Sequence, residues 1–348
     1  MILVDMLDPT SPDAPVAAHF GDPLREQRTL ATEVGIVDRS HRGVLAVPGE
    51  DRFTWLHSLT TQHLLGLRPY EGTELLVLSP HGQVEHEAMV LDDGTTTWLD
   101  VEPGTAPGLL SFLESMRFMM RVEPADVTAD WALLSLVGPA APEAAVALGA
   151  AVLPEVDAVA PPGPKFAAGS VPARPTARYA GSPLPAGGWA RRGPVGVDLL
   201  VPRSAADGVL ASAGVPRCGV WAYEAIRVAA RVPRFGFETD HRTLPAELGW
   251  YPALHLEKGC YRGQETVARV HHLGRPPRRL VLLHLDGVTT DHPPARHAPV
   301  TTDEGRVVGF VGTALRHYEL GMIALAVVKQ NVSADAHLRV GEATAALD

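Results

Sequence analysis

The stretch V-G-I-V-D-R-S-H-R-G-V-L-A-V-P-G, Val34 to Gly49, decides the fold class of this chain. Two short runs rich in β-branched residues flank a polar turn at Asp38 to Gly43, which predicts two strands paired around that turn. In the next segment Phe53 and Leu56 recur at helical spacing after an acidic first turn. Two strands followed by an amphipathic helix are typical of an α+β fold.

The alternation of strands and helices continues outward from this stretch. Leu75 to Leu91 predicts a hairpin with S-P-H-G-Q as its turn, followed directly by the titratable residues Glu85, His86 and Glu87. Past Pro277 the sequence changes to short β-type runs separated by turns, which predict a small closed or rolled β-domain. We therefore expect an N-terminal arm over residues 1–26, an α+β region over 27–276 and a barrel domain over 277–348.

Composition limits the class of protein. A formal charge of −10 over 348 residues argues against a general nucleic-acid binder, because affinity for phosphate backbones depends largely on Lys and Arg. The longest apolar run, Ala132 to Pro154, is interrupted by prolines and Glu143, so we expect no membrane helix. The acidic N-terminus does not resemble a signal peptide, which predicts a cytoplasmic protein with both cysteines as thiols.

Basic residues gather in one segment of this acidic chain. Such a segment suits a small anionic ligand or one local RNA contact, while the alternative is a set of arginines that solvate helix and strand faces. The ten residues are Arg227, Arg231, Arg234, Arg242, Lys258, Arg262, Arg269, Arg275, Arg278 and Arg279.

The motif K-G-C-Y-R-G-Q-E, Lys258 to Glu265, is the candidate for chemistry. Two glycines flank a cysteine whose basic neighbours favour the reactive thiolate. The alternative is a tight turn in which Cys260 packs as a small apolar residue. The following T-V-A-R-V is interpreted as the start of a strand.

Three separated segments resemble the glycine-cleavage T-protein superfamily. They are D-R-S-H-R-G-V-L-A-V-P-G-E-D from Asp38, R-V-A-A-R-V-P-R-F-G from Arg227 with L-P-A-E-L-G from Leu244, and V-V-G-F-V-G-T-A with I-A-L-A-V-V-K near the C-terminus. The motif at Lys258 to Glu265 is similar to the YgfZ-type branch, whose members bind folate and serve iron–sulfur enzymes.

The resemblance implies a ring of two interlocked α+β domains and a C-terminal β-barrel around a central cavity for tetrahydrofolate or a derivative. It implies folate contacts by Arg227, His41 and Glu247. The chemistry is expected from Cys260, Lys258, Tyr261 and Glu85, with no metal site. The remaining motif residues are Gly259, Arg262, Gly263, Gln264 and Glu265.

Two positions depart from the superfamily pattern. The stretch G-Q-V-E-H offers Glu85 and His86 where the T-proteins have a reactive Asp. The stretch G-P-V-G-V-D has Pro194 at the place of a pteridine-binding Glu, and Pro194 has no side-chain hydrogen-bonding group.

Three functions follow from these residues. The first is an accessory protein for iron–sulfur cluster assembly or repair, with Cys260 as working thiol, iron–sulfur client or assembly proteins as partners and an indirect effect on tRNA modification. The alternative is a tetrahydrofolate-dependent one-carbon transferase or demethylase in which Glu85 or His86 handles the proton. The third is a folate- or tRNA-binding module without chemistry, so the sequence leaves the question of enzyme activity open.

Overall fold

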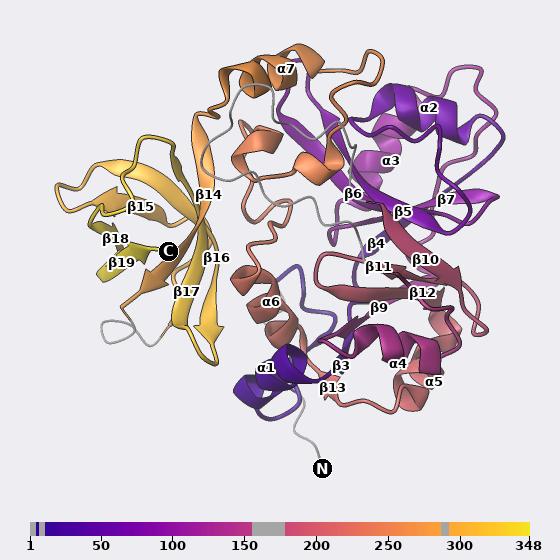
Figure 1. Ribbon diagram of the computed structural model, residues 1–348, viewed down its shortest axis with the longest axis horizontal. Helices are drawn as coiled ribbons and strands as arrows, with labels where there is room; N and C mark the ends of the chain where they lie inside the picture. The colour runs from indigo at the N-terminus through magenta and orange to yellow at the C-terminus, as the bar shows by residue number, and fades with distance from the viewer. Residues whose placement is uncertain (1–4, 7–10, 155–177, 287–291) are drawn as a thin grey trace.

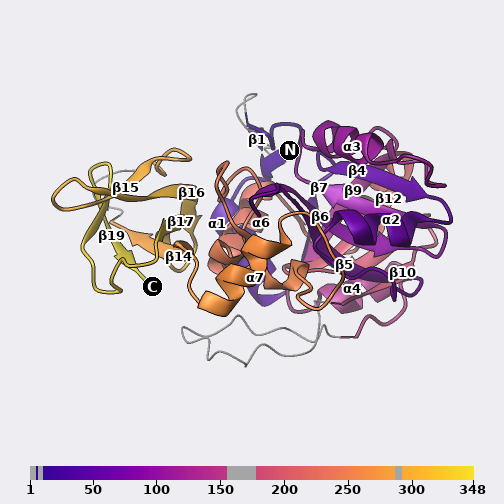
Figure 2. The same cartoon turned by 90° about the horizontal axis from the view of Figure 1, so that it is seen from above.

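The computed structural model describes residues 5–6, 11–154, 178–286 and 292–348. Its body is an 11-stranded sheet covered by helices, and a closed barrel forms a separate lobe beside that body (Figures 1 and 2). The prediction of an α+β fold with a C-terminal β-barrel is therefore confirmed. Among the described residues, no helix is long and apolar enough to cross a membrane.

The sheet consists of two halves that meet at β10, and every neighbouring pair is antiparallel except β13 and β3. From edge to edge the strands are β13 (Arg217–Cys218), β3 (Gly35–Asp38), β9 (Trp131–Val137), β12 (Gly196–Pro202), β11 (Trp189–Arg192), β10 (Tyr179–Pro183), β5 (Glu71–Leu78), β6 (Val84–Asp92), β7 (Thr96–Val101), β4 (Gly43–Pro48) and β8 (Ala125–Asp126).

Helices cover both halves, and short elements complete the body. The helices are α1 (Pro23–Thr32), α2 (Arg52–Leu59), α3 (Ala106–Ser115), α4 (Ala141–Ala147), α5 (Ala206–Ser212), α6 (Val220–Ala229) and α7 (Gln264–Leu273). The 3-10 turns are η1 (Arg203–Ala205), η2 (Pro245–Glu247) and η3 (Tyr251–Ala253), and β1 (Asp5–Met6) pairs with β2 (Ala17–His19).

The predicted pairing of the two strands around the Asp38 to Gly43 turn is wrong. Strand β3 pairs with β9 in one half of the sheet, whereas β4 pairs with β7 in the other. The turn between them crosses from half to half, and its arginines point inward to ion pairs: Arg39 contacts Asp198 at 3.3 Å and Arg42 contacts Asp100 at 3.3 Å. These buried charges hold the crossing in place and interlock the halves.

Each half has its own apolar core. Helices α2 and α3 pack on the β4–β7 half, and α4 and α5 pack on the β9 and β12 half. Between the halves lies a third cluster that contains Val44, Leu91, Leu133, Trp189 and Leu200. Burial of these side chains on both faces explains the nearly continuous apolar runs of the strands.

The barrel closes on itself through six strands and has a separate core of Val, Leu and Ala side chains. Its strands are β14 (Arg278–Leu285), β15 (Pro299–Thr302), β16 (Val307–His317), β17 (Gly321–Lys329), β18 (Leu338–Val340) and β19 (Ala343–Leu347). At the entrance to β14, Arg278 donates to Asp240 and Glu247, at 2.7 Å each, and so fixes the barrel to the preceding loop.

The run T-V-A-R-V after the cysteine motif is helical, so its interpretation as a strand is wrong. Glycines in the left-handed region bracket α7: Gly263 has φ +80° and Gly274 has φ +66°. A Cβ on Gly263 would lie 2.5 Å from the carbonyl oxygen of Ser79, and one on Gly82 would lie 2.6 Å from Cβ of Thr266. The motif and the hairpin turn therefore pack backbone to backbone, which only glycines permit.

This packing predicts different effects for the two motif glycines. Gly263→Ala combines a left-handed backbone with a clash against a neighbouring backbone, so it should lower the free energy of unfolding by about 1–3 kcal/mol. The matched control is Gly259→Ala, because nothing lies within 4 Å of a Cβ there. Urea denaturation measures both variants, and equal stability of the two would contradict the account.

Candidate functional site

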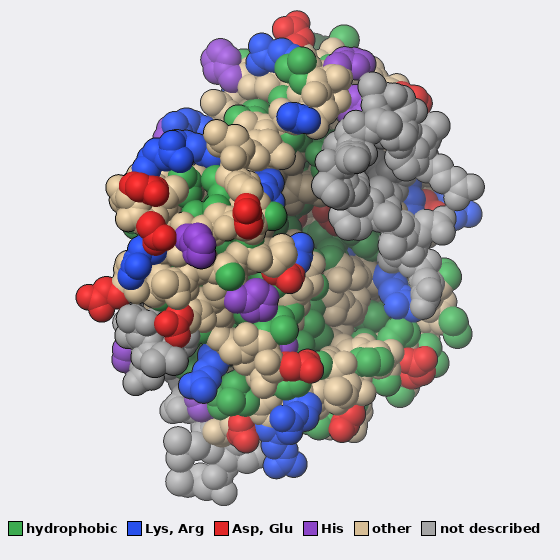
Figure 3. All heavy atoms as spheres, turned by 60° about the vertical axis from the view of Figure 1, so that its left-hand side comes forward, with side chains coloured by type: hydrophobic (Ala, Val, Ile, Leu, Met, Phe, Trp, Pro, Cys, Tyr) green, Lys and Arg blue, Asp and Glu red, His purple; other side chains and the backbone are tan. Residues whose placement is uncertain are grey.

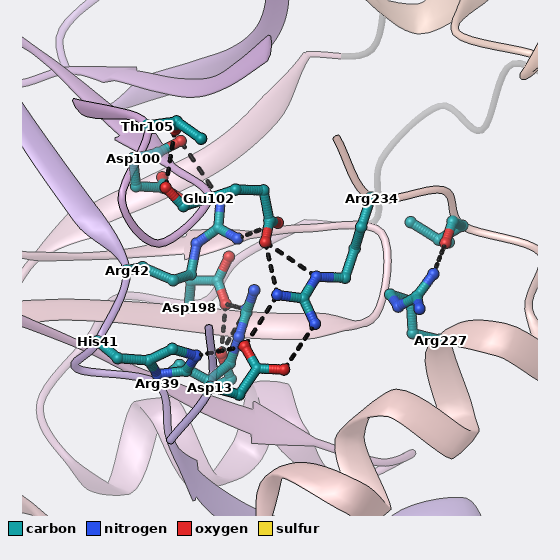
Figure 4. A network of polar contacts seen from close by, with 12 residues as sticks. Asp13, Arg39, His41, Arg42, Asp100, Glu102, Thr105, Asp198, Arg227 and Arg234 are labelled. Carbon is teal, nitrogen blue, oxygen red and sulfur yellow. Dashed lines mark hydrogen bonds and ion pairs between the residues drawn. The ribbon is translucent and has the colours of Figure 1, made fainter. Parts of the chain in front are cut away.

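One guanidinium, that of Arg234, lies at the centre of a buried polar network (Figure 4). It donates to Asp13 through Nη1 and Nη2 at 3.0 and 2.9 Å, and to Glu102 through Nε and Nη2 at 2.9 and 2.7 Å. Its Nη1 also lies 3.1 Å from Glu224 on α6. A single side chain thus joins the N-terminal arm, the end of β7 and a helix. Part of the predicted N-terminal arm is therefore buried.

Glu102 is ionised within this network. Burial by itself would raise the pKa of its carboxyl, but Arg234 and Arg42 outweigh burial and lower that pKa to about 2. Arg42, the residue immediately before β4, contacts Glu102 at 2.5 Å. The two arginines therefore fix both carboxylate oxygens of Glu102, while each arginine also pairs with other carboxylates.

Arg227, the predicted folate ligand, is 2% exposed and has every donor engaged. It donates to Glu224, to the carbonyl of Val232 and to Thr313 of β16, and it lies 3.4 Å from Glu238. These contacts tie α6 to the barrel. A folate contact by Arg227 stays a prediction, because such a contact requires one of these bonds to open.

The turn after α6 is fixed to the barrel through Glu238, which is fully buried. Its Oε1 accepts from the backbone N–H and the hydroxyl of Thr313 at 2.8 and 2.6 Å, and its Oε2 accepts from the N–H of Arg234 at 2.7 Å. A Cβ on Gly312 would lie 2.5 Å from Glu238, so glycine makes room for this carboxylate.

A cavity of about 290 Å³ opens beside the network, where the arm, the sheet and the barrel meet. Phe237 lies between two guanidiniums, with Arg234 at 3.9 Å and Arg296 at 4.7 Å from its ring centre. Arg296 is exposed and makes no ion pair with another described residue. The lining includes Pro12, Glu102, Thr105, Phe235, Phe237 and Arg296.

The three titratable residues after the hairpin turn lie in three different environments. Glu85 is the extra residue of a β-bulge and pairs at the surface with Arg262, at 3.0 Å. His86 lies against α3, where its Cε1 would be 3.3 Å from a Cβ on Gly108. The structure thus brings neither Glu85 nor His86 beside Glu102.

Glu87 lies in one row with Glu102 and Arg42. In the pairing of β6 with β7, Met89 lies opposite Asp100, so the same register places Glu87 opposite Glu102. In the pairing of β4 with β7, Gly43 lies opposite Val101, so the same register places Arg42 opposite Glu102. Burial raises the pKa of Glu87 to about 8, an effect that Arg42 opposes and Glu102 reinforces.

In the cysteine motif most side chains support the turn itself. Lys258 donates its three N–H groups to carbonyls at the C-terminus of α2, those of His57, Thr60 and Gln62. Burial lowers the pKa of Lys258 to about 7, while three carbonyl acceptors favour the ammonium form. Gln264 accepts from the N–H of Tyr261, which is buried and whose pKa burial raises to about 12.

The two cysteines differ in access. Cys260 is exposed, whereas Cys218 is buried against α1, where burial and Glu26 raise the pKa of its thiol to about 12. Glu265 is exposed at the first turn of α7. Of the two cysteines, only Cys260 is exposed enough to react with a molecule from solvent. The side chains around Cys260, however, are engaged in structural contacts.

The remaining predicted ligands are also held by protein groups. His41 contacts Asp13 at 2.9 Å through Nε2, while its buried Nδ1 has no hydrogen-bond partner in the described structure. Glu247 accepts from Arg278 and from the N–H of Leu244, away from the cavity. In the ranges that the structure covers, no group of three or more His, Cys, Asp or Glu could hold a metal ion.

Most side chains of the basic segment interact with the protein itself. This agrees with the alternative interpretation, in which the arginines lie on helix and strand faces and do not bind a ligand. Eight of its ten members donate to carboxylates or carbonyls, which leaves Arg269 and Arg275. On the face that Figure 3 draws, basic and acidic side chains are interspersed. No local spacing in the sequence indicates Asp13 or Glu102 as site residues, since both are far along the chain from Arg234.

Comparison with known proteins agrees with this architecture. Residues 17–155 match the family model of the GCVT N-terminal domain. The aminomethyltransferase of Parasynechococcus marenigrum is 26% identical over 308 residues, 84% of this chain and 78% of that protein. The aminomethyltransferase of Geobacillus kaustophilus is 27% identical over 325 residues, 91% of this chain and 85% of that protein.

A solved structure shares the fold. The glycine cleavage system aminomethyltransferase T from Bartonella henselae matches with a TM-score of 0.74 over 98% of this chain and 89% of that chain, at 18% identity. The relatives are named transferases, so the iron–sulfur accessory function expected from the Cys260 motif is wrong and its alternative is favoured. The chain is therefore similar to the GCVT N-terminal domain over residues 17–155, and over nearly its entire length it shares the fold of a solved aminomethyltransferase.

Proposed function

We propose that this protein is a tetrahydrofolate-dependent one-carbon transferase or demethylase. The observation that carries the proposal is the cavity at the junction of arm, sheet and barrel, with aromatic walls, a fixed carboxylate and a guanidinium that makes no ion pair with another described residue. The aminomethyltransferases among its relatives give the class of reaction.

The cavity wall fits the chemistry of a reduced folate. Phe235 offers an apolar ring surface to an aromatic ligand, and Arg296, which lies over Phe237 and has no other described ion-pair partner, offers a cation to a ligand carboxylate. Thr105 adds a hydroxyl on the same wall, although that hydroxyl donates to the carbonyl of Glu102 at 2.7 Å. A volume of about 290 Å³ suits a ring system better than an entire folate, so the charged tail would point outward.

In this proposal tetrahydrofolate accepts the one-carbon unit, and the protein orients it. Arg234 and Arg42 hold Glu102 ionised and immobile, because both its oxygens accept charge-assisted hydrogen bonds. Arg234 also stacks on Phe237, so the aromatic wall and the carboxylate are positioned by the same side chain. Little rearrangement is needed when a ligand binds, which favours affinity.

Two narrower assignments belong to this proposal. The motif Lys258 to Glu265 supports a place in the YgfZ-type branch, and a cytoplasmic location is proposed with it. Neither assignment changes the residues that line the cavity.

Removal of the free cation should weaken folate binding. Arg296→Ala deletes an ion pair with a ligand carboxylate and should raise the Kd for tetrahydrofolate about tenfold, which corresponds to about 1.4 kcal/mol. Anaerobic calorimetry measures the change, with Arg269→Ala as the control, since Arg269 is also exposed and unpaired among the described residues. Equal Kd values for the parent and Arg296→Ala would show that this cavity does not take the folate tail.

The exposed thiol should be dispensable for the transferase. Cys260→Ser removes no described contact, so tetrahydrofolate binding and one-carbon loading of folate should stay within about twofold of the parent. Iodoacetamide should label Cys260 well before the buried Cys218. Loss of one-carbon transfer in Cys260→Ser would instead assign the chemistry to the thiol.

A further inference from the structure

Five basic side chains gather beside the C-terminus of α2, outside the folate cavity. The ring centres of His57 and His63 lie 4.9 Å apart, and those of His63 and His255 lie 5.0 Å apart. The charge of Lys258 acts on His57 and His255, and the charge of Arg178 acts on His255. We call these five residues the basic cluster. None of them is among the residues that line the folate cavity.

Separate segments of the chain bring the basic cluster together. His57 lies in the last turn of α2, and its Nδ1 accepts at 3.4 Å from a backbone N–H of the loop that carries His63. His255 follows η3, and its backbone N–H donates to the carbonyl of Thr61 at 3.0 Å. Arg178 immediately precedes β10. Backbone contacts therefore position the imidazole rings without help from a ligand.

Two buried nitrogen atoms of the basic cluster lack partners. The Nδ1 of His255 and the Nη1 of Arg178 make no hydrogen bond in the part of the chain that the structure describes. Buried polar atoms of native proteins are nearly always hydrogen-bonded, so these two indicate a ligand or solvent acceptor. An oxyanion can accept from a guanidinium and from an imidazole at the same time.

The nearest carboxylates neutralise the basic cluster only in part. Glu71 attracts Arg178, but Glu71 already accepts from the Nε of Arg68 at 2.7 Å. Arg68 in turn repels Arg178. Glu257 faces His255 but is exposed, so water screens its charge. The guanidinium of Arg178 thus remains without an ion-pair partner among the described residues.

Mutual repulsion in the basic cluster keeps its histidines neutral. Burial, followed by the charges of Lys258, His63 and His255, lowers the pKa of His57 to about 4. Burial and then His63 lower the pKa of His255, and Lys258 and Arg178 add to this effect. A negative charge placed among these groups would reverse the repulsion and favour the protonated rings.

We propose that the basic cluster is a binding site for a small, doubly charged oxyanion of the phosphate type. The guanidinium of Arg178 donates to the anion, the fixed ammonium of Lys258 attracts it, and His57 and His255 take up protons as it binds. No covalent bond forms or breaks. This site is separate from the folate cavity, so the inference does not depend on the proposed function.

Sulfate binding to the full chain tests the site, because sulfate keeps its double charge over the pH range in which histidine titrates. Binding that protonates a histidine strengthens as the pH falls. Calorimetry should therefore show about tenfold tighter sulfate binding at about pH 5.5 than at about pH 7.5. Arg178→Gln should raise the Kd about tenfold. The matched control is Arg275→Gln, an exposed arginine after α7, which should bind sulfate as the parent does.

A second variant separates proton uptake from simple attraction. His255→Gln should retain part of the sulfate affinity but lose much of its pH dependence, whereas His272→Gln, an exposed histidine on α7, should keep both. Equal Kd values for the parent and Arg178→Gln overturn the proposal. Binding that strengthens as the pH rises, or no sulfate binding by the parent at either pH, also overturns it.

An NMR titration of the imidazole rings gives an independent measurement. Saturating sulfate should raise the pKa of His57 from about 4 by at least about one pH unit, because the anion offsets the charges of Lys258 and His255. Without sulfate, His255→Gln should also raise the pKa of His57, since one cationic neighbour is removed. A pKa of His57 that does not respond to sulfate contradicts the proposal.

Discussion

The guanidinium of Arg234 is the interaction on which the other parts of the site depend. It binds carboxylates from the N-terminal arm, from the end of β7 and from α6, and its backbone N–H binds Glu238, which is tied to the barrel. Buried charges of this kind contribute little net stability when paired, but loss of one partner leaves the others uncompensated and costs several kcal/mol. Their main effect here is to fix the relative positions of the three parts around one cavity.

The same constraint explains the charge states in the site. Arg234 and Arg42 together hold Glu102 as a carboxylate, and burial together with that fixed negative charge raises the pKa of the neighbouring Glu87. Two acids of the same type therefore differ in pKa because of their positions in a single row across β4, β7 and β6. The cavity wall combines the ionised Glu102 with aromatic side chains and with Arg296, which makes no ion pair with another described residue.

Local pattern in the sequence predicted the elements well. The hairpin at Leu75 to Leu91 and the barrel after Pro277 follow from alternation and turn residues, which act over a few positions. The helix α7 was missed because its β-branched residues favour a strand. Glycines with left-handed backbone conformation lie at both ends of this segment and delimit a helix. The pairing of β3 with β9 and of β4 with β7 was missed because the inward ion pairs of Arg39 and Arg42 direct the chain across the sheet.

The site was harder to predict for a physical reason. Arg234 meets Asp13 across 221 positions and Glu102 across 132, and no local spacing encodes such contacts. The resemblance gave Arg227 and Glu85, yet both are engaged by other protein groups. The three titratable residues after the hairpin turn were visible in the sequence, but the bulge at Glu85 hid that each lies in a different environment.

A crystal structure of the protein soaked with 5-formyl-tetrahydrofolate tests the central claim most directly. The account predicts the folate ring against Phe235 and Phe237, its carboxylates toward Arg296, and the Arg234 contacts to Asp13 and Glu102 unchanged. Folate bound elsewhere, or a cavity that admits it only after Arg234 releases Glu102, would contradict the account.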